Sequence, residues 1–593
     1  MPKYISKEHG IHNAKVFKDS LSLADTTALK QSTVLYAVLG RAEDWVDEDV
    51  APTPIETDQD KHYELWRQAW AGKKITSGDA EHVVPRHNWT TGTAYAMYRD
   101  RDKNLHDRPF YVITDQNNVY KCLSNNKGAL STIRPTGFST TAFTTSDGYH
   151  WKYMYTVSLG QADKFMTAAY MPVRTLANTD SSTEGNRQIL VQNAAANGAI
   201  EVVETVNVGS GYQQLANAVP DSATTTSITL STASGDTPSP VDNFYNGASV
   251  YIISGTGSGQ LRRVIDYSGQ TKVLTVNTNF QTLPNTDTRM IVSPTVTIIG
   301  DGLNAKAYSK VNTLTGGIAN VFMITTGTGY RRANAVISSN SLHGTGATAN
   351  VIMSPIGGHG KDAVRELGGD KLLLNAQFDG SLGVSSTARG YVPANTDFRT
   401  ISLLKNPILK VDENNVPIGV EKISNTSNSP ATLRLSTELS ISYQSMSGST
   451  PVNALSAGDT ITQKRAKLAA ELGTLQFVTE LSPTVRENSV VAMNNAVLAA
   501  NADIIYIRND EAQSDASFFT MYINNVESYA DIVPFTKDDI LFGRGSTVEV
   551  ATVSTINGPE ANTFSGQFLH TENITKVTRS VDQTEDIKII LDF

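Results

Sequence analysis

A near-duplicated segment between residues 196 and 355 restricts the fold of this chain more than any other feature of its sequence. Gly198-Ala199-Ile200 lies fourteen residues before Tyr212, and Gly316-Gly317-Ile318 lies fourteen residues before Tyr330. Each copy continues into Ala-Asn-Ala-Val, at 216–219 and at 333–336. The residues between are largely β-branched or small, which favours strands and turns. We therefore predict that 196–355 folds as a pair of related β units.

The first copy is interrupted by additional chain. The second copy continues directly into GTGATA at 344–349, whereas the comparable GLNAKA of the first copy comes only at 302–307. The intervening residues contain the apolar runs ASVYII, LRRVIDY and KVLTV, separated by glycine-rich turns. This pattern predicts a small β module at about 220–293, nested inside the first copy.

The rest of the chain predicts a mostly β, α+β, multidomain protein with some flanking helices. We expect a discontinuous core domain into which the repeat-type β modules are inserted. The length of 593 residues agrees with several domains, because a single core stops growing well below this size. The expected domains are an N-terminal domain at 1–190, the repeat pair at 196–355, a return to the core at 356–430, a second β-rich insertion or domain at 431–560, and a C-terminal segment at 561–593 that completes the core sheet.

Hydrophobic periodicity predicts the individual elements. Leu65, Trp66, Ala69 and Trp70 fall at helical spacing, and a DQNN turn between two β-rich runs indicates a hairpin. The predicted helices are 12–30, 58–72 and 458–477, the hairpin is 108–123, and the predicted strands are 31–40, 149–156, 397–409, several within 501–555, and 587–593.

Charge and cysteine content exclude several classes of protein. The net charge of −9 argues against a protein that wraps nucleic acid, which needs a dense basic face. The single cysteine, Cys122, cannot form an intrachain disulfide, which fits assembly in a reducing cytoplasm. No run of 18 or more apolar residues and no apolar N-terminal signal segment occur, so neither a membrane span nor a leader is expected.

Seven phrases in the outer parts of the chain resemble one family. They occur in the family's order and reach the last residue. The phrases are LGRAEDW at 39–45, VVPRHNW at 83–89, NVYKCL at 118–123, DGYHWKYMY at 147–155, FRTISLLKNP at 398–407, FLHTENITKVTR at 568–579 and DQTEDIKIILDF at 582–593. In these stretches the chain resembles the gene-8-type baseplate wedge subunit of T-even-type contractile-tailed bacteriophages.

This resemblance implies a structural virion protein, made in the host cytoplasm and built into the tail baseplate. It implies a homodimer that contacts other wedge proteins, several mostly β domains with flanking helices, and no catalytic activity. The repeat region and most of 408–560 have no clear counterpart in the shorter members of the family, so this chain resembles an enlarged version with inserted β modules.

The sequence offers weak signs of chemistry, and each has a simpler structural interpretation. GGHG at 357–360 before KDAVRELG lacks the spacing of a phosphate-binding loop, and His359 has no nucleophile signature beside it. Asp582, Glu585 and Asp586 fit a solvated charge run better than a catalytic carboxylate pair. The histidines at 62, 82 and 87 lack metal-ligand spacing. We therefore expect no enzyme activity, no cofactor and no metal site.

Aromatic residues are the candidates for contacts. Tyr212 and Tyr330 follow Gly-x-Gly at equivalent repeat positions, and we favour a turn-closing role over a platform for sugar or protein binding. All five tryptophans lie in the first 151 residues, where they serve either a core or an interface: Trp45, Trp66, Trp70, Trp89 and Trp151.

Two functions from different classes remain beside each other. The first is a baseplate wedge scaffold that binds neighbouring proteins during assembly and contraction. The second is an adhesin-like tail protein that binds host surface glycans through the inserted β units, which predicts exposed aromatic side chains on 196–355. A tail hydrolase would instead require a pocket of converging carboxylates.

Overall fold

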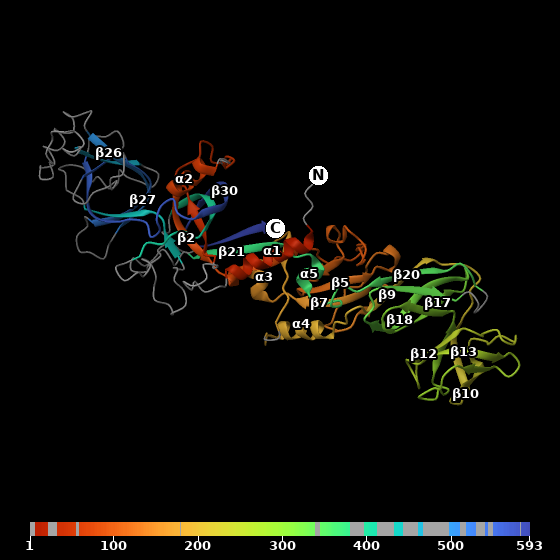
Figure 1. Cartoon of the computed structure of the whole chain (residues 1–593). Coiled ribbons are helices and arrows are strands. Elements are labelled where there is room, and N and C mark those ends of the chain that lie inside the picture. Colours follow the sequence, from red (N-terminus) through yellow and green to blue (C-terminus); the bar gives the residue numbers. More distant parts are fainter. Residues whose placement is uncertain are drawn as a thin grey trace. The chain divides into compact units, whose positions relative to one another are not determined.

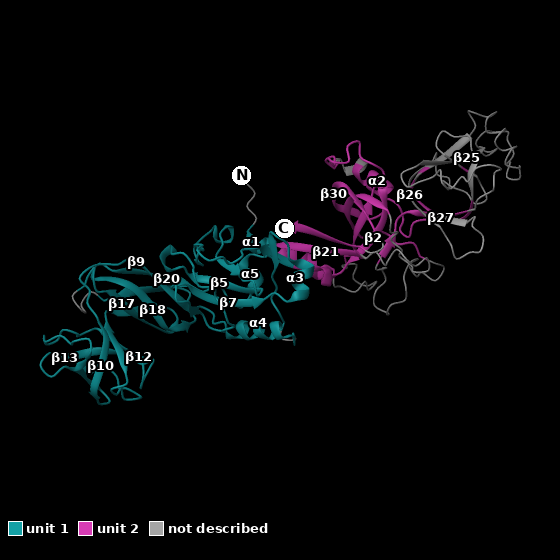
Figure 2. Ribbon diagram, turned by 180° about the vertical axis from the view of Figure 1, so that it is seen from behind, with its two compact units in different colours: residues 1–11, 82–370 teal, residues 12–81, 371–593 magenta. Residues whose placement is uncertain are grey.

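The computed structural model describes most of the chain, and its contacts divide it into two compact units. Unit 1 comprises residues 1–11 and 82–370, and unit 2 comprises residues 12–81 and 371–593 (Figure 2). Residues 1–190, which the sequence assigns to one domain, thus contribute to both units. The described residues are 6–21, 33–54, 58–177, 180–338, 344–379, 396–411, 432–442, 460–466, 497–509, 518–528, 540–543, 549–580 and 583–593.

The protein is mostly β, as predicted from its sequence, with a few short helices (Figure 1). A small antiparallel sheet in unit 1 has the strand order β4-β5-β7-β6. The DQNN turn joins β4 to β5, so the hairpin predicted at 108–123 is confirmed. These four strands are β4 (Tyr111–Ile113), β5 (Asn118–Ser124), β6 (Phe143–Thr144) and β7 (His150–Thr156).

The remaining elements of the first part of unit 1 surround this sheet. Strand β3 pairs antiparallel with β8, and α4 contacts β7. The helix α5 begins after Asp362, whose side chain accepts a hydrogen bond from the backbone N–H of Arg365. The bounds are β3 (Ala80–Pro85), β8 (Tyr170–Pro172), α3 (Leu159–Phe165), α4 (Thr183–Ala194) and α5 (Ala363–Leu367).

The two repeat copies fold together into one closed barrel with the strand order β16-β17-β18-β9-β20-β19. Each copy supplies three strands, and exchanging β9 with β18, β16 with β19 and β17 with β20 leaves the order around the barrel unchanged. The barrel therefore has internal two-fold topology. Its strands are β9 (Ile200–Asn207), β16 (Thr295–Gly300), β17 (Leu303–Asn312), β18 (Gly317–Thr328), β19 (Ala333–Ile337) and β20 (Thr348–Met353).

A second closed barrel, with the order β10-β11-β14-β13-β12-β15, is inserted after β9. The Ala-Asn-Ala-Val of the first copy lies in β10 of this barrel, so its likeness to residues 333–336 does not reflect an equivalent position. The strands are β10 (Leu215–Ala223), β11 (Ser227–Gly235), β12 (Ser249–Ser254), β13 (Leu261–Ser268), β14 (Val273–Val276) and β15 (Arg289–Ser293).

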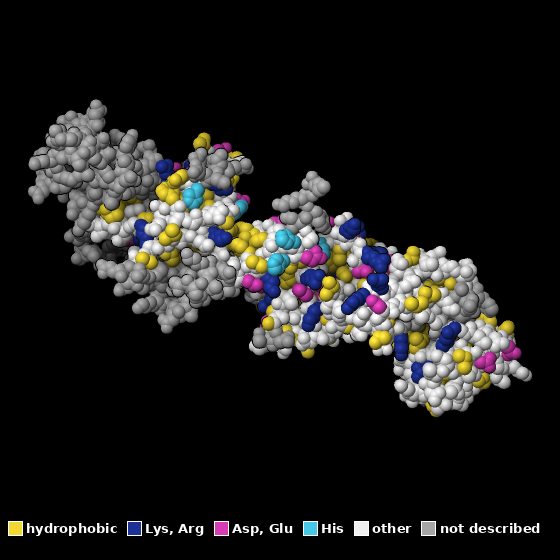
Figure 3. Space-filling model, viewed as in Figure 1, with side chains coloured by type: hydrophobic (Ala, Val, Ile, Leu, Met, Phe, Trp, Pro, Cys, Tyr) yellow, Lys and Arg dark blue, Asp and Glu magenta, His cyan; other side chains and the backbone are white. Residues whose placement is uncertain are grey.

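Few charged side chains appear over these two barrels on the face shown in Figure 3. Their cores are apolar, with Ile228, Val250 and Leu274 fully buried in the inserted barrel. Burial of such side chains is the dominant favourable contribution to folding. The low density of charged side chains on this face fits the Ser, Thr and Asn content of the region.

Unit 2 is built on a five-stranded antiparallel sheet with the order β23-β2-β1-β22-β30. Trp70 and Leu403 are fully buried in its core. Strands β21 and β31 pair antiparallel over nine residues, which ties the C-terminal strand into the unit. The bounds are β1 (Leu35–Gly40), β2 (Ala69–Ile75), β21 (Lys371–Asp379), β22 (Asp397–Lys405), β23 (Thr432–Arg434), β30 (Gln567–Thr578) and β31 (Thr584–Asp592).

A third closed barrel in unit 2 has the order β24-β27-β26-β25-β28-β29. The helix predicted at 458–477 is wrong over its described part, because residues 460–466 form a strand that pairs with β26 and β28. Pairing on both sides outweighs the helical propensity of its Gln-Lys-Arg-Ala run. The strands are β24 (Thr437–Ser442), β25 (Thr460–Ala466), β26 (Val497–Asn509), β27 (Phe518–Ser528), β28 (Ile540–Gly543) and β29 (Glu549–Asn557).

The two N-terminal helices differ from their predicted bounds. Helix α1 (Lys7–Ser20) begins five residues before the predicted 12–30, and the rest of that range from 22 onward lies outside the described residues. Helix α2 (Asp58–Gln68) ends before Ala69 and Trp70, which belong to β2. Hydrogen bonding of β2 to β1 and β23 ends the helical spacing at this point.

Candidate functional site

The side chain of Arg399 organises the candidate site in unit 2. It lies on β22, and it is fully buried. Its Nε donates to both carboxylate oxygens of Glu48, at 2.9 and 3.0 Å, and its Nη1 donates to the carbonyl oxygen of Ala42 at 2.7 Å. Its Nη2 donates to Asp44 at 2.5 Å. The planar guanidinium thus uses all three nitrogens to hold residues 41–50, which we name the acidic loop.

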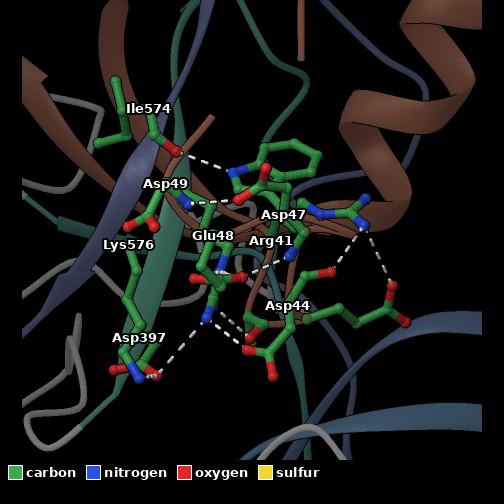
Figure 4. A network of polar contacts seen from close by, with 12 residues as sticks. Arg41, Asp44, Asp47, Glu48, Asp49, Asp397, Ile574 and Lys576 are labelled. Atoms are coloured by element: carbon green, nitrogen blue, oxygen red, sulfur yellow. Dashed lines mark hydrogen bonds and ion pairs between the residues drawn. The ribbon is translucent and has the colours of Figure 1, made fainter. Parts of the chain in front are cut away.

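The acidic loop follows β1 and contains Glu43, Asp44, Asp47, Glu48 and Asp49. Its first residue, Arg41, has a positive φ of 53°, which turns the chain away from the sheet. Hydrogen bonding from Arg399 lowers the pKa of Glu48 and keeps this carboxylate charged. The loop therefore presents negative charge in a fixed conformation (Figure 4).

Trp45 fixes the other side of the acidic loop. Its indole N–H donates to the carbonyl oxygen of Ile574 on β30 at 2.9 Å, and the Arg41 guanidinium lies 4.1 Å from the ring centroid. The neighbouring Val46 and Val50 are exposed. A loop held from two sides loses little conformational entropy on binding, so its exposed acids and valines suit a protein contact.

A small pocket of about 200 Å³ lies beside this loop. Trp45, Pro52 and Leu65 supply apolar surface, while Lys61 and Glu64 supply charge. The Asn573 side chain donates to the carbonyl oxygen of Pro52 at 2.9 Å, which fixes one wall. The pocket is suited to receive one side chain from a partner protein.

The phrases that carry the family resemblance form the frameworks of the two units. In unit 2, β22 and β30 pair antiparallel with two register shifts and contain most of FRTISLLKNP and FLHTENITKVTR, while LGRAEDW begins in the last two residues of β1. In unit 1, NVYKCL and DGYHWKYMY form the paired strands β5 and β7. Several polar residues of these phrases form internal bonds, such as Arg579 Nε to Glu585 at 2.8 Å.

A second buried ion pair stabilises unit 1. The Lys121 ammonium lies 2.8 Å from Glu366, and both side chains are almost wholly buried. Glu366 also accepts from the backbone N–H of Gly360 at 2.8 Å, and Lys121 lies 4.0 Å from the ring centroid of Tyr98. Burial lowers the pKa of Lys121, while Glu366 opposes that shift. The feature of the sequence that indicates this pair is Lys121, a charged residue within the apolar run NVYKCL.

The GGHG loop at 357–360 has the structural role that its sequence favours. It makes glycine-dependent turns before α5, with φ of 90°, 99° and 90° at Gly357, Gly358 and Gly360. His359 is buried against Tyr98, at 4.8 Å between ring centroids. Burial holds the pKa of His359 well below its usual range, so the ring is neutral.

The other predicted candidates for chemistry are separated. His82 binds the carbonyl oxygen of Gly369, His87 packs on Tyr111, and His62 binds the carbonyl oxygen of Phe564. Asp586 binds Asn375, and Asp582 lies outside the described residues. In the described part of the chain, no three His, Cys, Asp or Glu side chains are arranged to hold a metal ion.

The predicted tryptophans are distributed over both units. Trp66 and Trp70 are buried in unit 2, and Trp151 is buried in unit 1, stacked on Tyr149 at 5.3 Å. Trp45 and Trp89 are partly exposed. Of the five, Trp45 is the one that lies in the acidic loop, where it also lines the small pocket.

The two repeat tyrosines are buried, and each accepts a hydrogen bond from the backbone of the other copy. Tyr212 of the first copy receives a hydrogen bond from the backbone N–H of Ala347 in the second, at 3.2 Å. Tyr330 of the second copy receives one from the N–H of Ala305 in the first, at 3.4 Å. The Tyr212 ring occupies the space that a Cβ on Gly344 would need, and the Tyr330 ring occupies the space that a Cβ on Gly302 would need. Their positions agree with a turn-closing role.

Comparisons with known proteins identify no family. No family model matches the chain, and no curated protein matches it. Among solved structures, it is similar to a chain of the "Virion of native gene transfer agent (GTA) particle", at 10% identity and a TM-score of 0.11, covering 44% of this chain and 79% of that one. Among the described residues, no helix has the length and apolar character needed to cross a membrane.

Proposed function

We propose that this chain is a structural protein of a virion, a baseplate wedge subunit of a contractile phage tail. It scaffolds neighbouring wedge proteins through protein interfaces during assembly and contraction, forms a homodimer, and catalyses no reaction. The observation that carries this proposal is the ordered acidic loop at the LGRAEDW phrase, held by the buried Arg399. The family resemblance of the seven phrases supports it.

The charge and rigidity of the acidic loop suggest what it binds. The exposed carboxylates of Asp47 and Asp49 would attract a basic surface on a neighbouring protein, while Val46 and Val50 add apolar contact. Rigid-body movement during contraction would preserve such a contact, because the loop is fixed to β22 and β30.

A charge-reversal experiment tests this interface. We expect Asp47→Lys with Asp49→Lys to weaken complex formation with a wedge partner by about tenfold or more, mainly through slower association. The matched control, Asp266→Lys with Asp287→Lys, makes the same charge change on exposed residues of the inserted barrel. Equal affinities of the two variants, measured by surface plasmon resonance, would refute the acidic loop as the contact.

The second candidate, glycan binding through the inserted β units, also has one observation in its favour. Tyr251, Tyr308 and Phe322 form a continuous ring stack, with centroid distances of 4.6 and 5.3 Å. Phe322 is 38% exposed, and the two tyrosines are partly exposed. Aromatic rings at such positions can contact saccharides or proteins.

A further inference from the structure

A cavity of about 360 Å³ lies within unit 1, lined by residues of β7, β9 and β18. Its volume falls in the range of small-molecule sites, about 300–1,000 Å³. One wall comes from the N-terminal sheet and the opposite wall comes from the repeat barrel, so the site exists only because the two are packed together. The acidic loop belongs to unit 2 and takes no part in it.

Buried hydrogen-bonding groups line this cavity. The side chain of Lys152, a residue that is only 2% exposed, donates to the carbonyl oxygen of Thr140 at 2.6 Å. An ammonium has three N–H groups, so Lys152 retains capacity for further acceptors. Unsatisfied N–H groups of a buried ammonium are costly unless a ligand or water accepts from them.

A carboxyl group faces the same cavity. Glu201 on β9 has no described side-chain partner within hydrogen-bond distance, although it interacts electrostatically with Lys152 and Lys121. Burial raises the pKa of Glu201, which reflects its withdrawal from solvent. His150 lines the cavity from β7, with its Nδ1 2.9 Å from the hydroxyl of Thr144. Donors and acceptors of both signs therefore converge on one space.

An aromatic ring forms the apolar part of the cavity. Phe322 and Met323 line it from β18, and Met97 lines it from the N-terminal part of the unit. The ring of Phe322 is held by stacking on Tyr308, which in turn stacks on Tyr251. A fixed, partly exposed ring beside polar groups is an arrangement that matches amphipathic ligands.

We propose that this cavity binds a neutral saccharide. Sugar hydroxyls both donate and accept hydrogen bonds, so one ring can satisfy both Lys152 and Glu201. The apolar C–H face of the sugar would lie against Phe322. Lys152 would attract a simple anion, but Glu201 would repel it. Glu201 would attract a simple cation, but Lys152 would repel it. The presence of both charges in one cavity therefore favours an uncharged ligand. The site binds and carries out no reaction.

Saturation-transfer NMR on the full chain tests this proposal, with neutral hexoses, N-acetylhexosamines and their disaccharides as probes. Sialic acid and glycine serve as the anionic and zwitterionic comparisons. We expect binding of at least one neutral sugar, with an affinity that salt leaves unchanged. Phe322→Ala and Glu201→Gln should each weaken it by about tenfold. Phe138→Ala, which removes a ring of similar exposure outside the cavity, should leave it unchanged.

Circular dichroism spectra of the variants establish that unit 1 remains folded. Absence of binding by every neutral sugar would overturn the proposal, as would binding of only the charged comparisons. Sugar binding that survives both Phe322→Ala and Glu201→Gln would also overturn it, by placing the ligand elsewhere. Loss of wedge assembly in the variant Asp47→Lys with Asp49→Lys tests the proposed scaffold and not the sugar site, because those residues lie in unit 2.

Discussion

The Nε of Arg399 lies 2.9 and 3.0 Å from the two carboxylate oxygens of Glu48, across 351 residues of sequence. This bond joins a loop near the N-terminus to a strand of the late core. It explains how a loop with five acids keeps one conformation despite their mutual repulsion, since the buried cation is shared by Glu48 and Asp44.

Replacing Arg399 should destabilise unit 2 and release the acidic loop. Arg399→Lys keeps the charge but loses the forked geometry, and Arg399→Leu loses both. We expect the leucine variant to lower the free energy of unfolding by at least about 2 kcal/mol, and the lysine variant to lie between it and the wild type. Thermal unfolding with loop proteolysis measures this, with Arg101→Lys as the exposed control. An unaltered melting temperature in Arg399→Leu would contradict the locking role.

The buried pair in unit 1 should show strong coupling. Lys121→Met leaves the Glu366 carboxylate buried without its cation, and we expect a loss of about 3 kcal/mol in urea unfolding. Adding Glu366→Gln should restore part of this, because the amide oxygen can still accept from Gly360. Arg134→Met, which breaks an exposed pair with Asp115, should cost less than about 1 kcal/mol. If the change in unfolding free energy of the double variant equalled the sum of the changes for Lys121→Met and Glu366→Gln, the coupling between the two residues would be excluded.

The interlocked repeat copies make a steric prediction. A Cβ on Gly302 would lie 2.4 Å from the Tyr330 ring, and one on Gly344 would lie 2.0 Å from the Tyr212 ring. We expect Gly302→Ala and Gly344→Ala each to destabilise the barrel by about 2 kcal/mol or more. Gly160→Ala, with no heavy atom within 4 Å of the added Cβ, is the control and should be neutral or stabilising. An unchanged unfolding free energy in both Gly302→Ala and Gly344→Ala would mean that the tyrosine rings do not pack against the glycines of the other copy.

Unit 1 should lose stability in mild acid. Burial, aided by the charge of Lys152, lowers the pKa of His150 to about 4 from a usual value near 6.5. Between about pH 4 and 6.5, His150 is therefore protonated in the unfolded chain but neutral in the folded unit. The stability that the neutral His150 contributes is complete above about pH 6.5 and is lost as the pH falls towards 4. At pH 4 the loss reaches roughly 3 kcal/mol. Denaturant unfolding at pH 7 and 4.5 should show a smaller difference in His150→Gln than in the wild type, and equal differences would contradict this.

Local patterns were sufficient to predict the strands and the hairpin, whereas long-range pairing was not. The Gly-x-Gly-Tyr repeat indicated two related β units, but Tyr212 and Tyr330 bond across copies, and nothing in either copy alone encodes that exchange. Lys121 and Arg399 stand out as charges within apolar strands, which signals a buried partner without naming it. Their partners, Glu366 and Glu48, lie too far along the chain for periodicity to identify.

The mass of the complexes that the full chain forms tests the proposed scaffold most directly. Multi-angle light scattering would be applied to the purified chain alone and mixed with candidate wedge proteins of a contractile phage tail. A scaffold should give a mass of two chains alone, and a discrete larger complex in the mixture. A chain that keeps the monomer mass of 64.0 kDa in both samples would contradict the account.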